Sequence, residues 1–251
     1  MPLFVILRHG ETQWARENRF AGWGDTALSE AGKTEVEQAA KAIVKQGLTF
    51  RRCHTSRLFR ANQTVEILRA NKVQFDGHPV ADWRLNERHY GALQGLTRSA
   101  VIEKYGNAQT VEWRRSFTET PPPLEQSDPR WHEQLQRFPD IDPSVQPAAE
   151  SIRTAAERVS GIWNDAILPD LQIGLNVLLV AHTSSIRGIT RLVENLDDQQ
   201  TADFRIATSI PIIYEFAPDL ASCRKSEIAT GTKGYLRQLA NRLKPRRFGR
   251  F

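Results

Sequence analysis

The sequence is poor in sulfur: among 251 residues it has two cysteines and one methionine. Cys53 and Cys223 are too few for a disulfide scaffold and suit a reducing cytosol, so we expect a cytoplasmic protein. No apolar stretch is as long as a membrane span. Residues 1–10 lack the basic region of a signal peptide and run straight into a polar motif. These absences argue against a disulfide-rich secreted domain and predict no membrane span.

Negative charge is lacking at one end of the chain. The net charge is +5, and residues 232–251 hold seven Lys or Arg residues and no Asp or Glu, which leaves −2 for the rest. We therefore expect one nearly neutral domain over residues 1–231 and a basic tail over 232–251. A solvated terminus and a surface for acidic lipid or nucleic acid are both compatible with this tail. Nothing in it reads a base, so we predict no specific nucleic-acid partner.

The first informative feature of the sequence is a predicted buried strand that is followed by a polar motif. The apolar run of residues 3–7 is typical of a strand, and Arg8, His9, Gly10 and Glu11 follow it directly. Ligands bind at the carboxyl ends of strands in open α/β sheets. A nucleophilic histidine beside a fixed cation, next to a glycine that lets a ligand come close, indicates chemistry on an anion such as a phosphoryl group. Solvated polar residues at a strand end are the alternative.

A second strand delivers a second histidine. Residues 175–181 are apolar and end at His182, and a helix over 185–195 with Ser185 as its cap is expected to follow. His182 then lies where helix N–H groups converge. Further helices are predicted over 29–46, 56–70, 151–168 and most of 97–118, with a strand at 211–216. This alternation predicts an α/β fold, a three-layer sandwich whose mostly parallel central sheet is flanked by helices.

Three more segments carry charge suited to an anion. Arg60 follows the predicted helix cap Ser56, and helix N–H groups beside a cation favour phosphate. Glu87 lies in a polar loop, where a carboxylate is a general acid/base or half of a surface ion pair. Arg114 and Arg115 form a cation pair that grips a second anionic group or lies on a solvated helix face. Two strand-terminal histidines, several arginines and one carboxylate together indicate a phosphoryl-transfer site.

These segments carry a resemblance to a known family. The sequence resembles the cofactor-dependent phosphoglycerate mutases of the histidine phosphatase superfamily. The matching stretches are RHGETQW at 8–14, ENRFAGW at 17–23, TSRLFRA at 55–61, LNERHYGALQGL at 85–96, WRRSF at 113–117 and VAHTSSIR at 180–187. RHGE alone indicates only the superfamily, whereas LNERHYGALQG together with WRR is much more specific to the mutase branch.

The resemblance implies a role for each matching residue. His9 is implied as the phosphate acceptor, Glu87 as the proton carrier, and Arg8, Arg60 and His182 as the groups that hold the phosphoryl group. The implied substrate-binding residues are Thr12, Ala15, Ala21, Gly22, Arg88, Tyr90, Arg98, Arg114, Arg115, Thr183 and Ser184. The implied activity interconverts 2- and 3-phosphoglycerate, with 2,3-bisphosphoglycerate as phosphoryl primer and a homo-oligomer, a dimer, as the assembly. No metal is expected, because the six histidines lack metal-ligand spacing.

The chain departs from the family at five of these positions. The family usually has Asn at the position of Ala15, Thr or Ser at that of Ala21, Lys at that of Arg98, and Gly-Asn where this chain has Thr183 and Ser184. We expect backbone N–H groups at 15, 21 and 183 to reach phosphate nevertheless. A phosphatase acting on a small phosphorylated metabolite is therefore the rival activity. A non-catalytic binding protein that uses the basic tail is the rival outside enzymes.

Residues 120–151 hold seven prolines and are expected to form no regular element. A long segment without secondary structure inside a compact domain is typical of a functional loop. Because it follows Arg115 closely, a lid over the site is the preferred interpretation, and a tolerated insertion is the alternative.

Overall fold

The computed structural model describes residues 1–230, so the basic tail and the predicted boundary at residue 231 lie outside the described residues. Six strands form the central sheet in the order β5-β3-β6-β1-β7-β8. They are β1 (Leu3–Arg8), β3 (Arg52–Thr55), β5 (Val80–Ala81), β6 (Val177–Ala181), β7 (Ile212–Phe216) and β8 (Cys223–Glu227). β5, β3, β6 and β1 run parallel, and β7 and β8 add an antiparallel edge. A small separate sheet pairs β2 (Thr49–Phe50) with β4 (Gln74–Phe75).

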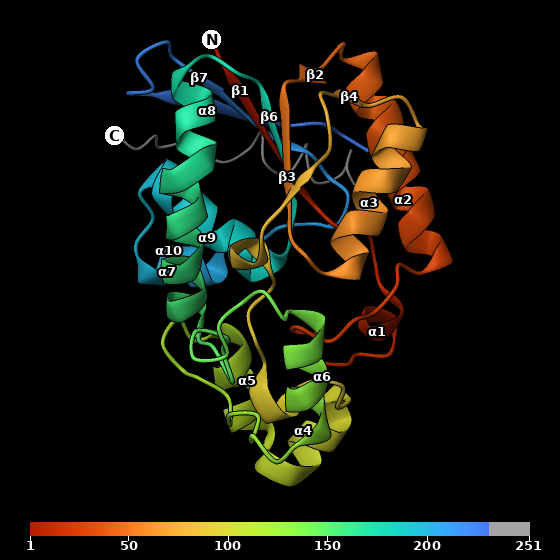
Figure 1. Ribbon diagram of the computed structural model, residues 1–251, viewed down its shortest axis with the longest axis vertical. Coiled ribbons are helices and arrows are strands. Elements are labelled where there is room, and N and C mark those ends of the chain that lie inside the picture. Colours follow the sequence, from red (N-terminus) through yellow and green to blue (C-terminus); the bar gives the residue numbers. More distant parts are fainter. Residues whose placement is uncertain (231–251) are drawn as a thin grey trace.

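Helices cover both faces of this sheet (Figure 1). One face carries α2 (Glu30–Lys45) and α3 (Phe59–Ala70). The other carries α7 (Ile152–Ile162), a π-helical turn (Trp163–Ile167), α8 (Leu168–Gln172), α9 (Thr183–Glu194) and α10 (Asp198–Asp203). The predicted three-layer α/β fold is thus confirmed.

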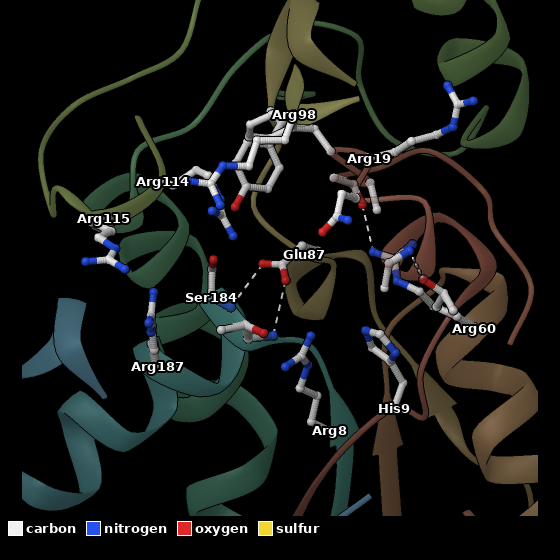
Figure 2. A pocket seen from close by; sticks show the side chains of 18 residues that line it. Arg8, His9, Arg19, Arg60, Glu87, Arg98, Arg114, Arg115, Ser184 and Arg187 are labelled. Carbon is white, nitrogen blue, oxygen red and sulfur yellow. Dashed lines mark hydrogen bonds between the residues drawn. The ribbon is translucent and has the colours of Figure 1, made fainter. Parts of the chain in front are cut away.

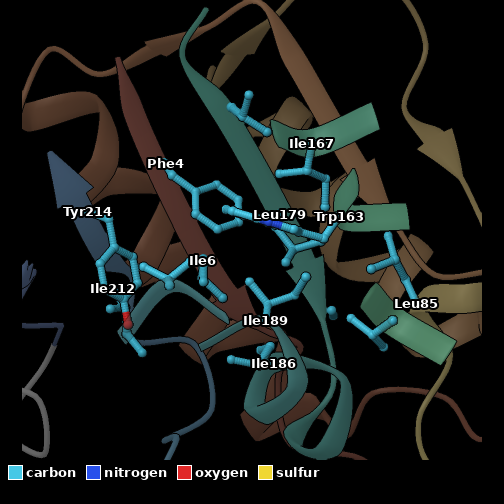
Figure 3. Close-up of a cluster of buried hydrophobic side chains, with 14 of the residues drawn as sticks. Phe4, Ile6, Leu85, Trp163, Ile167, Leu179, Ile186, Ile189, Ile212 and Tyr214 are labelled. Carbon is cyan, nitrogen blue, oxygen red and sulfur yellow. The ribbon is translucent and has the colours of Figure 1, made fainter. Parts of the chain in front are cut away.

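Two apolar cores hold the three layers together, because alternate residues of the buried strands face opposite sides of the sheet. Phe4 and Ile6 of β1 pack with Trp163, Ile189 and Tyr214 on the α7–α9 side (Figure 3). Val5 and Leu7 pack with Val36 and Ile43 of α2 and with α3 on the other side. β1 is therefore covered on both faces, which explains why its sequence is a continuous apolar run.

A third group of elements lies beyond the carboxyl end of β1 (Figure 1). It contains α4 (Arg98–Tyr105), α5 (Asn107–Arg115) and α6 (Pro129–Arg137), and α1 (Gln13–Arg16) follows β1 directly. Two short 3-10 turns, Trp83–Leu85 and Gly91–Leu93, flank the loop that carries Glu87. Gly106, with φ of 82°, separates α4 from α5, so the predicted helix over 97–118 is two helices.

Three predicted elements need correction. The helix expected from 56 begins at Phe59, and its cap residue is Leu58, whose backbone nitrogen donates to the Ser56 hydroxyl at 3.2 Å. The helix expected from 185 begins at Thr183, with His182 as cap residue. Residues 120–151, expected to lack regular structure, contain α6. Asp128 caps that helix and Pro129 is its first residue, a position where proline fits a helix well.

Candidate active site

A cavity of about 420 Å³ lies at the carboxyl end of β1 (Figure 2). Seven arginines of the described chain line it: Arg8, Arg19, Arg60, Arg98, Arg114, Arg115 and Arg187. Among the described residues, Glu87 is the only acidic one in this lining. The cavity therefore has a strongly positive wall and fits an anionic ligand with more than one charged group.

His9 lies at the floor of this cavity, where β1 ends. Its side chain is 6% exposed, and its backbone nitrogen donates to the carbonyl of Ala181 at 3.1 Å. Nδ1 lies 2.7 Å from the carbonyl oxygen of Gly10, so Nδ1 carries the proton and Nε2 keeps a free electron pair. Burial lowers the pKa of His9 well below its ordinary value, and the nearby cations Arg60 and Arg8 lower it further. His9 is thus a neutral imidazole with the electronic state of a nucleophile.

Gly10 serves packing rather than ligand access, contrary to our expectation. A side chain there would place its Cβ 2.5 Å from the carbonyl oxygen of Gly32 and 2.9 Å from a methyl group of Val36. Gly10 therefore lets the end of β1 approach α2 closely.

Arg60 and Arg8 flank His9 (Figure 2). Arg60 is 1% exposed, and it donates to the carbonyls of Gly22 at 2.7 Å and Gly24 at 3.0 Å, which fix its guanidinium. Burial lowers the pKa of Arg60 to about 10, so it is a cation at neutral pH. Arg8 donates to the carbonyl of Ile206 at 3.1 Å. Within residues 1–230 its Nε atom is buried and has no hydrogen-bond partner, so this donor is left unsatisfied.

Glu87 lies across the cavity from His9, on the N-terminus of α9 (Figure 2). Its Oε2 accepts from the backbone nitrogen of Thr183 at 3.1 Å, and its Oε1 accepts from those of Ser184 at 3.0 Å and Arg88 at 2.8 Å. Burial acts to raise the pKa of Glu87. The bonds from Arg88 and Ser184, together with the charge of Arg60, outweigh burial and hold that pKa below its ordinary value. The helix terminus therefore holds a carboxylate.

These bonds correct two expectations about backbone groups. The N–H groups at the start of α9 bind Glu87, so they do not reach a phosphate in this arrangement. Near the start of α3, the N–H group of Phe59 likewise donates to Asp25. The N–H of Ala15 donates to Thr12 Oγ1 at 3.1 Å. Of the three backbone groups expected to reach phosphate, those at 15 and 183 are already engaged.

His182 lies beside His9, with 4.9 Å between the ring centroids. It is fully buried, and it is not among the residues that line the cavity. Its Nε2 lies 2.6 Å from the hydroxyl of Ser56. Burial, Arg60 and His9 all lower its pKa. The structure thus brings the two predicted histidines together, but it places His182 behind His9.

The predicted cations of the outer wall converge on the cavity. Arg98 of α4 and the last two residues of α5, Arg114 and Arg115, lie across Glu87 from His9 (Figure 2). In the described chain, Nε of Arg98 is buried and has no hydrogen-bond partner. Arg98 and Arg8 thus carry unsatisfied donors at opposite ends of the cavity, as expected of a site for two anionic groups.

The other predicted binding residues divide into two groups. The cavity is lined by Thr12, Ala15, Ala21, Gly22, Tyr90, Thr183 and Ser184. Arg88 is absent from the lining and fully buried. It donates to the hydroxyl of Tyr90 at 2.9 Å, and its guanidinium lies 4.5 Å from the centre of that ring. Arg88 therefore holds Tyr90 in place rather than facing the cavity.

Four further lining residues were not predicted: Asn18, Arg19, Phe20 and Arg187. Arg19 donates to the carbonyl of Gly95 at 2.8 Å, which directs it along the cavity rim. All four lie inside stretches that match the family, 17–23 and 180–187, so the motifs contained the signal although the side chains were not assigned to the site.

Two negative findings concern the described residues only. No cluster of three or more His, Cys, Asp or Glu side chains within residues 1–230 is arranged to hold a metal ion. In the same part of the chain, none of the helices combines the length and the apolar character that crossing a bilayer requires.

Comparison with known proteins shows which family the chain belongs to. Residues 4–128 match the model of the histidine phosphatase superfamily, branch 1. A 2,3-bisphosphoglycerate-dependent phosphoglycerate mutase of Lactobacillus acidophilus is 38% identical over 228 residues, which cover 91% of this chain and 99% of that protein. The chain belongs to this superfamily. The family resemblance inferred from the sequence is thereby confirmed. The mutase of the same name from Hamiltonella defensa is 38% identical over 86% of this chain and 87% of that protein.

Solved structures of the superfamily share the fold. A protein described as mycobacterial hydrolase 1 superposes with a TM-score of 0.68 at 23% identity, covering 92% of this chain and 100% of that one. A mycobacterial glucosyl-3-phosphoglycerate phosphatase gives a TM-score of 0.64 at 23% identity, over 90% of this chain and 97% of the other. At such identities the likeness concerns the fold alone.

Proposed function

We propose that this protein is a phosphoglycerate mutase that interconverts 2- and 3-phosphoglycerate through phosphorylated His9. The observation that carries the proposal is that arginines lie at both ends of one cavity. Arg8 and Arg60 flank His9, and Arg98, Arg114 and Arg115 lie across Glu87 from it. A monophosphate alone would leave one end unmatched, whereas a phosphoglycerate presents a phosphate and a carboxylate. Relatives at 38% identity that carry the mutase name support this reading.

Each catalytic role follows from the state of the group. The neutral His9 accepts a phosphoryl group on Nε2, because Nδ1 is bonded to the Gly10 carbonyl. Arg8 and Arg60 offset the charge on the phosphoryl oxygens during transfer. Glu87, held as a carboxylate, takes the proton of the attacking substrate hydroxyl and returns it to the leaving oxygen. His182 supports His9 from behind, and its ring contact sets the position of the nucleophile.

The primer 2,3-bisphosphoglycerate fits the residues present. Its two phosphates and one carboxylate match a cavity with seven arginines, two of which have a buried Nε without a partner in the described chain. Arg8 and Arg60 would hold one phosphate, and Arg98, Arg114 and Arg115 the other. When bound, the primer supplies the phosphoryl group that His9 first carries. The proposal also includes a small phosphorylated substrate, a location in the cytosol and assembly into a homo-oligomer.

The rival activity, a phosphatase, is favoured by one observation. Ala15 and Ala21 line the cavity without a side-chain hydrogen bond to offer, so a bound phosphate is held by fewer groups there. The lid function of residues 120–151 has less support, since no residue of that segment lines the described cavity.

The deciding experiment incubates the protein with 3-phosphoglycerate, with and without the bisphosphate. Phosphorus NMR then follows 2-phosphoglycerate and free phosphate together. Formation of 2-phosphoglycerate that depends on the primer supports the mutase. Release of free phosphate without any 2-phosphoglycerate would replace it with the phosphatase.

A further inference from the structure

Arg158 and Glu150 form a buried ion pair directly behind the loop that carries Glu87. Arg158 Nε lies 2.7 Å from Glu150 Oε1, and Nη2 lies 2.8 Å from Oε2, which is the two-pronged geometry of a strong pair. The side chains are only 7% and 5% exposed. Arg158 belongs to α7, whereas Glu150 lies near the end of the Pro-rich segment 120–151, two residues before that helix begins.

The remaining donors of Arg158 all go to the backbone of the Glu87 loop. Nη1 donates to the carbonyl of Arg84 at 2.8 Å and, at longer range, to those of Trp83 at 3.3 Å and Asn86 at 3.2 Å. Nη2 reaches the carbonyl of Glu87 at 3.3 Å. One guanidinium therefore gathers four carbonyl groups that would otherwise repel one another.

Glu150 fixes the other side of the same loop. Its Oε2 accepts from the backbone nitrogen of His89 at 2.9 Å, and its own backbone nitrogen donates to the carbonyl of His89 at 2.8 Å. The indole of Trp23 adds one more bond, to the carbonyl of Glu87 at 2.7 Å. The backbone is thus clamped before, at and after Glu87.

This clamp leaves little freedom in the direction of the Glu87 side chain. With its backbone fixed from α7, the carboxylate meets the N–H groups of Thr183 and Ser184 on α9. A deeply buried ion pair contributes little net stability compared with apolar side chains of similar volume, because desolvation offsets its attraction. The ion pair instead fixes the position of the Glu87 loop. Position matters for a proton carrier, since displacing a catalytic group by about 1 Å costs about a hundredfold in rate.

We infer that Arg158 and Glu150 are positioning residues for Glu87, and that the Pro-rich segment acts as a brace for the proton carrier instead of a lid. The inference rests on the proposed role of Glu87 in phosphoryl transfer. It assigns a catalytic consequence to two residues that touch neither the cavity nor a substrate.

The test is a double-mutant cycle between Arg158→Lys and Glu87→Gln. Lysine keeps the charge and its attraction to Glu150, but a single ammonium cannot bind several carbonyls in the plane of a guanidinium. We expect Arg158→Lys to lower kcat by roughly 10- to 100-fold with KM nearly unchanged. The acid limb of the kcat profile should move to higher pH, because a loosened Glu87 loses bonds to its charged form. In the Glu87→Gln background, Arg158→Lys should change kcat by no more than about twofold.

Arg191→Lys is the matched control. Arg191 also joins two segments through a carboxylate, because its Nη2 lies 2.8 Å from Asp198 Oδ1 and its Nη1 donates to the hydroxyl of Thr201 at 3.1 Å. It connects α9 to α10, however, and within residues 1–230 it makes no hydrogen bond to the backbone around Glu87. Its kcat should stay close to that of the wild type. Equal losses in both lysine variants, multiplicative effects in the cycle, or a loss confined to KM would each overturn the inference.

Folding is checked by circular dichroism and thermal unfolding. If Arg158→Lys does not fold, the same cycle is run with Glu150→Gln, which keeps the shape of the side chain and one accepting oxygen. The cycle can be followed on any transfer through His9, including hydrolysis of the bisphosphate. A wild type that hydrolyses without isomerising therefore contradicts the proposed function alone, whereas an active mutase with a multiplicative cycle contradicts this inference alone.

Discussion

The Nδ1 atom of His9 lies 2.7 Å from the carbonyl oxygen of Gly10. Because this bond occupies Nδ1, we predict that the phosphoryl group of the covalent intermediate is carried on Nε2. After incubation with 2,3-bisphosphoglycerate, mass spectrometry should find one acid-labile phosphate, and nitrogen-15 NMR should assign it to Nε2. His9→Ala should abolish both the label and turnover. Phosphate retained in that variant would refute the assignment of the nucleophile.

Glu87→Gln should slow phosphoryl transfer by roughly 10²–10⁴-fold, the usual contribution of a general acid/base. Substrate binding should change little, because the arginines that line the cavity remain. Single-turnover kinetics separates the two effects. A rate within a few-fold of that of the wild type would show that Glu87 only accepts hydrogen bonds from the N-terminus of α9 and carries no proton.

The pH dependence follows from the shifted groups. The pKa of His9 is lowered by burial and the nearby arginines, and that of Glu87 is lowered because its hydrogen bonds and Arg60 outweigh burial. Both reactive forms, the neutral imidazole and the carboxylate, therefore persist below the usual values of about 6.5 and 4.3. We predict that kcat/KM shows no acid limb near pH 6.5. Stability from ionised Glu87 is complete above its unfolded pKa and is lost as pH falls through the folded value.

The fold and the centre of the site could be predicted where the signal is local. β1 and β6 carry continuous apolar runs because both faces are covered, and each strand is followed directly by a histidine, His9 or His182. β3, with the sequence Arg-Cys-His-Thr, carries no such run, and its place in the sheet depends on pairing with β6. The same limit applies to Ser56, which is not the cap residue of α3 and whose hydroxyl also lies 2.6 Å from Nε2 of His182, 126 residues away.

The polar network behind Glu87 shows a second limit on prediction from the sequence. Arg158 lies on an amphipathic helix, and nothing in the spacing of its neighbours distinguishes it from a solvated arginine. Its partners, Glu150 and the carbonyls of residues 83–87, come from segments joined only by the folded chain. The prolines of 120–151 likewise indicated irregular chain, whereas Asp128 and Pro129 form a helix start. Burial converts such residues into parts of the site, and burial is a property of the whole fold.

Gly91→Ala should destabilise the protein far more than Gly77→Ala. Both glycines have positive φ, 57° and 61°, so both changes carry the conformational cost of about 1 kcal/mol. At Gly91 a Cβ would also lie 2.0 Å from the carbonyl oxygen of Pro122, whereas nothing lies within 4 Å at Gly77. The extra clash should add about 1–3 kcal/mol. Denaturant unfolding of the two variants measures the difference, and equal losses would show that the Pro122 segment yields freely.

The final prediction concerns the balance between transfer and hydrolysis. Ala15 and Ala21 line the cavity and offer no side-chain hydrogen bond. The backbone N–H of Ala15 is engaged by Thr12 and that of Thr183 by Glu87, so neither replaces what is missing. Each absent bond to a charged phosphate corresponds to about 1.5–3 kcal/mol of holding energy.

A bisphosphate that is held less firmly leaves more often, and each departure exposes phosphorylated His9 to water. We therefore expect a mutase with measurable hydrolysis of 2,3-bisphosphoglycerate. The double variant Ala15→Asn with Ala21→Thr should lower the ratio of hydrolysis to transfer, while Ala70→Asn, on an exposed position of α3, should leave it unchanged. Phosphorus NMR on one reaction mixture gives both rates. An unchanged or higher ratio in the double variant would mean that other groups, such as Arg19 on the same rim, already hold the phosphate in place of the two missing side chains.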